Sequence, residues 1–199
     1  MGKSVVLGCL VVVLVGVLIV GGLAAGAYNR LNAADQAVSA GWAQVENVYQ
    51  RRADLIPNLV ETVKGAANFE KDTLTAVIQA RASATQVKLD ANSIKDPAAF
   101  EKFQKAQDGL SSALSRLLVT VEKYPELKAN ANYLSLQAQL EGTENRIAVE
   151  RGRFNESTQT YNTLRKSFPT VIVASFAGFK ERPYFKGAEG SEKPPAVKF

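Results

Sequence analysis

The sequence contains no histidine and only one cysteine, Cys9. Without histidine there is no imidazole to act as a general base near neutral pH or to ligate zinc, iron or copper. One cysteine can neither close a disulfide within the chain nor build a cysteine-ligated zinc cluster. We therefore expect no catalytic residues, no metal and no cofactor, and the chain is predicted not to be an enzyme.

The sequence also lacks a large excess of charge of one sign. Lysine and arginine number 24, aspartate and glutamate number 19, and the formal net charge is +5. Basic residues are interspersed with acidic ones, so the chain has no basic block of the kind that nucleic-acid binding requires. We expect no nucleic-acid partner and no small-molecule substrate. The 199 residues suit one globular domain with appendages.

Long hydrophobic runs occur in one place, residues 5–27, where 23 consecutive residues carry no charge. As a helix this run would be about 34 Å long, enough to cross the ~30 Å hydrocarbon layer of a bilayer. We predict a transmembrane anchor over residues 1–27. Two alternatives remain open: a signal peptide cleaved before Tyr28, and a lipoprotein box at residues 6–9, although the apolar run follows Cys9 when it should precede it.

Two features of the anchor concern packing and orientation. Gly22 and Gly26 form a small-xxx-small pair that could let two such helices pack closely, although glycine is also simply common in membrane helices. Lys3 precedes the span, whereas Asp35 offsets Arg30 after it. The positive-inside rule then predicts a single-pass protein of the cell (inner) membrane, with a cytoplasmic N-terminus and a periplasmic or extracytoplasmic domain.

From residue 28 onward the apolar residues recur with helical spacing. The pattern predicts four helices, over about 28–65, 68–87, 96–124 and 130–168. Pro57 should kink the first of them and Gly65 should end it. Asp96-Pro97 is a helix start, because aspartate caps free amides and proline suits the first turn.

Four amphipathic helices with short connections predict an all-α fold, in which the transmembrane helix leads into an elongated, antiparallel, up-down-up-down four-helix bundle. We assign residues 28–187 to this bundle domain. If residue 168 lies beside residue 34 at the membrane end, Arg52 and Glu150 meet at the centre of a coiled-coil-like seam. We predict a buried ion pair between them. Alternatively, the seam is rotated by one position and both residues reach solvent.

The stretch from Leu140 to Glu156 is rich in charge, while Leu140, Ile147 and Phe154 recur every seven residues. Its charges fall mostly off the seam, as is typical of a solvated helix face. A di-iron carboxylate site would require histidine. A hydrolase with paired carboxylates is a remaining alternative, but no cleft that would raise a carboxyl pKa is evident.

After residue 169 the chain is first apolar and then combines aromatic with basic residues, which an antiparallel bundle would bring to the membrane end. We predict that these side chains lie in the lipid headgroup layer: Phe176, Phe179, Lys180, Arg182, Tyr184 and Phe185. Folding back as a fifth packing element is an equal alternative. Residues 188–199 are polar and contain prolines, and we predict that they are disordered.

Three segments, RRADLIPNLVETVKG (51–65), LEGTENRIAVERGRFNE (140–156) and FPTVIVASFAGFKERPYF (168–185), resemble the LemA family. The resemblance extends over nearly the whole chain except its end. It implies a membrane-anchored bacterial protein with a soluble antiparallel helical domain, and no established enzymatic activity. A relative associated with magnetosome membranes implies a membrane-organising role for some members.

We expect a non-enzymatic, membrane-anchored helical protein that forms a homo-oligomer or scaffolds other membrane components, with membrane shaping as one form of that role. The alternative is an adaptor that docks a membrane protein partner, such as a membrane protease or signalling complex. A scaffold should tolerate loss of residues 188–199, whereas an adaptor that docks through them should lose its partner in a pull-down.

Overall fold

The computed structural model describes residues 2–66, 69–90 and 93–187, and within these ranges it contains helices and no strand. The helices are α1 (Lys3–Lys64), α2 (Lys71–Gln86), the short 3₁₀ turn η1 (Ser93–Lys95), α3 (Pro97–Val121), α4 (Pro125–Lys128), α5 (Ala131–Lys166) and α6 (Thr170–Phe176). The prediction of an all-α fold is confirmed. The predicted tail over 188–199 lies outside the described residues.

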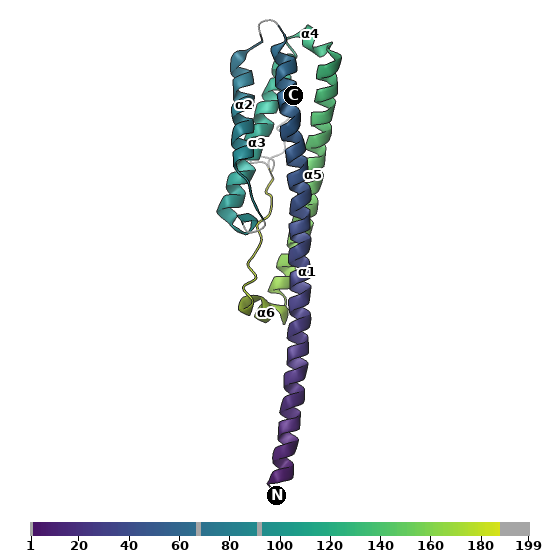
Figure 1. Cartoon of the computed structure of the whole chain (residues 1–199), viewed down its shortest axis with the longest axis vertical. Coiled ribbons are helices and arrows are strands. Elements are labelled where there is room, and N and C mark those ends of the chain that lie inside the picture. Colours follow the sequence, from purple (N-terminus) through teal and green to yellow (C-terminus); the bar gives the residue numbers. More distant parts are fainter. Residues whose placement is uncertain (1, 67–68, 91–92, 188–199) are drawn as a thin grey trace, which may run out of the picture.

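The four long helices alternate in direction (Figure 1). α1 packs closely along α5, and α2 packs along α3. α1 is much longer than its neighbours, so its N-terminal part extends alone beyond the bundle. The antiparallel up-down-up-down arrangement is therefore the one that the helix count and short connections predicted.

Local sequence accounts for the helix boundaries. The Asp96 carboxylate accepts a hydrogen bond from the Ala98 amide at 3.1 Å, and Pro97 occupies the first turn of α3. The Asn130 side chain caps α5 by accepting from Asn132 and Tyr133. α1 continues through Pro57 to Lys64 and ends beside Gly65, which keeps right-handed helical backbone angles. The short helices α4 and α6 were not predicted.

The core consists of two apolar clusters with a polar layer between them. The residues of the upper cluster nearest the polar layer are Ile56 on α1, Leu110 on α3 and Leu140 on α5. The residues of the lower, strongly aromatic cluster nearest that layer are Tyr49, Phe103 and Ile147 on the same three helices. Each of these pairs is one heptad apart on its helix. Arg52, Gln107 and Glu144 lie within those heptads, so one polar layer crosses the bundle between the clusters.

Residues 177–187 follow α6 and close the lower part of the bundle, where their last residues lie beside the first turns of α3. This returning segment leaves α6 and runs back up between the helices in an extended form (Figure 1). Phe185 lies in the lower cluster, 4.7 Å from Phe100 and 5.4 Å from Phe154 between ring centroids. The tail therefore folds back as a fifth packing element, the alternative that the sequence left open.

Candidate functional site

The polar layer is built around Arg52, whose side chain is fully buried. Its Nη1 donates to Ser111 Oγ and Glu144 Oε1, both at 2.7 Å, and its Nη2 donates to Gln107 Oε1 at 2.5 Å. Gln107 in turn donates to the Ala84 carbonyl of α2 at 3.2 Å. This network therefore joins all four long helices of the bundle.

The predicted ion pair between Arg52 and Glu150 is wrong. Arg52 pairs with Glu144, while Glu150 accepts a hydrogen bond at 2.9 Å from Arg153 on its own helix. The burial of Arg52 also contradicts the alternative that both residues reach solvent. The reason is the register of α5 against α1, which brings Glu144, six residues before Glu150, level with Arg52.

A second polar contact lies just below this layer. Arg151 donates from Nε to the Tyr49 hydroxyl at 2.5 Å and from Nη2 to Asp108 at 2.9 Å. The Arg151 guanidinium also lies 4.9 Å from the centroid of the Phe185 ring. It thus connects α1, α3 and α5 with the returning segment.

Burial raises the pKa of Tyr49, against the opposing effects of Arg151 and Arg52, and Asp108 raises it further. Because the pKa is higher in the folded than in the unfolded state, the stabilisation is fully present below about pH 10. It is expected to be lost as pH rises through the folded-state pKa, which unfolding measurements from pH 8 to pH 11 would detect. The Tyr49→Phe variant should lose less stability over this range. An equal loss in the variant would contradict the assignment to Tyr49.

Side-chain amides hold the backbone of the returning segment. Asn162 donates to the Arg182 carbonyl at 2.9 Å and accepts from the Arg182 amide at 3.0 Å. Asn155 makes the same pair of bonds with Phe185, at 3.0 and 2.9 Å. Gln104 does so with Lys186, at 2.8 and 3.2 Å. Each side-chain amide therefore pairs with one backbone N–H and one backbone C=O of the extended returning segment, as a neighbouring strand would in a sheet.

These amide residues were not predicted from the sequence. Asn155 and Asn162 are one heptad apart on α5, which places them on the same face of the helix. Two asparagines seven residues apart, next to the buried face of a helix, are the one sequence signal that could have identified them. The sequence does not indicate which backbone they would bind.

The predicted headgroup residues divide into three groups. Arg182 is 1% exposed, with its Nη2 2.6 Å from Asp35 Oδ1, and Phe185 is buried in the lower cluster. Placing these two in the headgroup layer is wrong, because the returning segment leads away from the membrane end and finds buried partners. Tyr184 lines a groove against α3 with Phe100 and Gln104.

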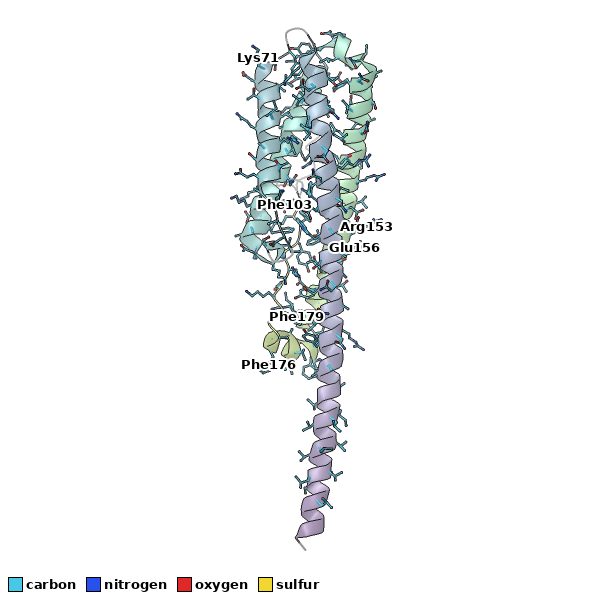
Figure 2. All side chains as sticks on the ribbon, viewed as in Figure 1. Lys71, Phe103, Arg153, Glu156, Phe176 and Phe179 are labelled. Atoms are coloured by element: carbon cyan, nitrogen blue, oxygen red, sulfur yellow. The ribbon has the colours of Figure 1, made fainter. Side chains whose placement is uncertain are left out.

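Phe176 and Phe179 lie where α1 leaves the bundle (Figure 2). Phe176 is 91% exposed at the end of α6. The Phe179 ring contacts Tyr28 edge to face, with 5.7 Å between centroids. Lys180 is exposed beside them. Their position agrees with a headgroup location, which stays a prediction.

A cavity of about 710 Å³ opens at this end of the bundle, and we call it the membrane-proximal cavity. It lies between α1, the start of α3 and the turn after α6. Its lining comprises Tyr28, Asn32, Asp35, Lys95, Asp96, Pro97, Tyr161, Ala177, Gly178, Phe179, Lys180 and Arg182. Asp35, a polar exception on the first helix of the bundle, is the ion-pair partner of Arg182 and is itself partly exposed, with 16% of its side chain accessible.

The exposed apolar part of α1 lies below the cavity. The structure has one helix long and apolar enough to cross a membrane, and its most hydrophobic window has a mean hydropathy of 2.9 and is not buried against the rest of the chain. Burial begins at Ala27 and Leu31. A membrane anchor and a signal sequence both satisfy this description. Apart from the adjacent residues and nearby backbone of α1, no atom of the described residues lies within 4 Å of the position that a Cβ would occupy at Gly22 or Gly26.

Comparisons with known proteins give a family and distant relatives. The model of the LemA family matches residues 41–199. Magnetosome protein MamQ of Magnetospirillum gryphiswaldense is 35% identical over 89 residues, which are 45% of this chain and 33% of that protein. Protein LemA of Metamycoplasma hominis is 23% identical over 145 residues, 73% of this chain and 62% of that protein. The match thus spans a third of the length of the magnetosome protein.

Proposed function

The chain belongs to the LemA family, and we propose that it is a non-enzymatic, single-pass membrane protein whose helical bundle self-associates or scaffolds other membrane components. Its α1 helix serves as anchor and as bundle helix at once. The soluble bundle is thereby held rigidly above the bilayer, and its orientation is set by the span.

The observation that carries this proposal is the continuity of α1. A single helix from Lys3 to Lys64 contains the exposed apolar run and then the buried residues of the bundle core. Exposing such a run to water is costly, at about 25 cal/mol per Å² of apolar surface. A bilayer removes that cost, and helix continuity then fixes the bundle relative to the membrane.

The exposed face of α6 supports the same placement. Large apolar side chains on and just before this short helix are exposed to solvent: Phe168, Val171, Ile172 and Phe176. α6 packs against α1 where α1 leaves the bundle. An apolar helical face next to a span is suited to the boundary between headgroups and acyl chains.

Self-association is tested most directly at Gly22 and Gly26, which the chain itself leaves uncovered. Replacing both by leucine should weaken association of the full-length protein about tenfold in neutral detergent, because the helices could no longer approach closely. Analytical ultracentrifugation in several detergents, together with imaging in lipid nanodiscs, would measure this.

The matched control is the leucine pair at Gly16 and Gly21, which adds the same apolar volume to other faces of the span. It should associate like the wild type. A wild-type protein that is strictly monomeric in every detergent and in lipid would overturn self-association. Release from membranes without detergent would overturn the anchor itself.

A further inference from the structure

The membrane-proximal cavity lies at the depth of lipid headgroups if α1 spans a bilayer. Tyr28, at its lower edge, directly follows the apolar run, and Asp35 is about 10 Å further along the helix at 1.5 Å per residue. The polar layer of a bilayer leaflet extends about 5–8 Å beyond the hydrocarbon core. The lower half of the cavity therefore faces headgroups.

The charges around this cavity favour an anion. Lys95, Lys180 and Arg182 line it together with Asp35 and Asp96. Asp35 is already paired with Arg182, and Asp96 caps the α3 amide of Ala98. Neither lysine forms an ion pair within the described ranges. The N-terminus of the 25-residue helix α3, the positive end of its dipole, lies at the same place.

One buried donor in the cavity lining still lacks an acceptor. Arg182 uses Nε and Nη2 for Asp35, at 3.0 and 2.6 Å, whereas Nη1 has no hydrogen-bond partner among the described residues. An unsatisfied buried donor is costly, and a charged one especially so. Nη1 has almost no exposed surface, so it places positive charge at the inner wall of the cavity and does not offer an open hydrogen-bonding position. A guanidinium group binds phosphate oxygens particularly well.

We propose that the membrane-proximal cavity binds the phosphate group of an anionic lipid, with Lys95 and Lys180 at its mouth and Arg182 at its inner wall. The aromatic pair of Tyr28 and Phe179 at the lower edge would contact the glycerol and upper acyl region. The inference rests on the proposed membrane anchoring. It adds a lipid class that the anchored bundle selects.

The test uses the full-length protein in neutral detergent micelles doped with equal amounts of phosphatidylglycerol and phosphatidylcholine. Mass spectrometry of the intact protein released from micelles counts the lipids that stay bound. The wild type should retain phosphatidylglycerol in preference to phosphatidylcholine. The Lys95→Ala/Lys180→Ala variant should bind it about 30-fold more weakly, because half-buried Lys95 and exposed Lys180 each attract the phosphate.

The matched control is Lys71→Ala/Lys102→Ala, which changes the net charge equally. Lys71 lies at the opposite end of the bundle (Figure 2), and Lys102 does not line the cavity. Equal loss in this control, or full retention by the cavity variant, would overturn the proposal. Inorganic phosphate and sodium chloride are then compared at equal ionic strength for their ability to displace bound phosphatidylglycerol. Stronger displacement by phosphate would assign the site to soluble phosphate and overturn the lipid assignment. Failure of anchoring would appear separately, as protein released without detergent.

Discussion

Replacing Arg52 by alanine is expected to lower the free energy of unfolding by about 2–4 kcal/mol, because it opens a cavity and leaves buried Gln107 without its donor, whereas Glu144, with 39% of its side chain exposed, is solvated by water. The change also removes the network that joins all four long helices. Denaturant unfolding of the full-length protein in neutral detergent, followed by circular dichroism, would measure it. A loss below about 1 kcal/mol would contradict the role assigned to the polar layer.

Glu144 and Glu150, six residues apart on α5, provide a matched comparison. Combined with Arg52→Ala, Glu144→Gln should give a coupling energy of about 1–3 kcal/mol, whereas Glu150→Gln should be additive within about 0.5 kcal/mol. The difference follows from geometry, since Glu144 contacts Arg52 and Glu150 contacts Arg153. Coupling of Arg52 to Glu150, and not to Glu144, would instead support the helix alignment predicted from the sequence, in which Arg52 lies opposite Glu150.

Replacing Phe185 by alanine should cost about 3–5 kcal/mol of stability. The ring is buried in the lower cluster and stacks on Trp42, with 6.2 Å between centroids. Trp42 is the only tryptophan in the chain, so its fluorescence reports directly on this cluster. The unfolding midpoint and the native-state emission should therefore both change.

Phe176→Ala is the matched comparison, because it removes the same aromatic ring from a site exposed to solvent. Its effect on the free energy of unfolding should stay within about 0.5 kcal/mol, and Trp42 emission should not change. Equal destabilisation by the two variants would contradict the division between buried and exposed aromatic residues. A stable Phe185→Ala variant would show that the returning segment contributes little to the bundle.

The seven-residue pattern predicted the faces of α1 and α5 correctly but not their register. Sliding one helix past the other by about a heptad presents an almost identical set of apolar residues to the seam. Both alignments therefore satisfy the pattern. The alignment with Glu144 level with Arg52 also places a polar layer between two apolar clusters, and contacts with α3 distinguish the two alternatives.

The returning segment could be recognised from sequence only as an apolar and then aromatic-basic stretch. Arg182 and Phe185 resemble headgroup anchors in composition, yet Asp35 and Trp42, both distant in sequence, bury them. Burial of a charge depends on whether a partner is nearby. Nothing local to residues 177–187 carries that information.

By itself the sequence determined the helical class, the number of long helices, their boundaries and the apolar run at the N-terminus. These properties follow from local propensity, capping and periodicity. Only the tertiary structure decided the partner of Arg52, the burial of Arg182 and the membrane-proximal cavity. These depend on contacts between residues separated by up to 147 positions, and side-chain periodicity is the same in every register that keeps the apolar faces together.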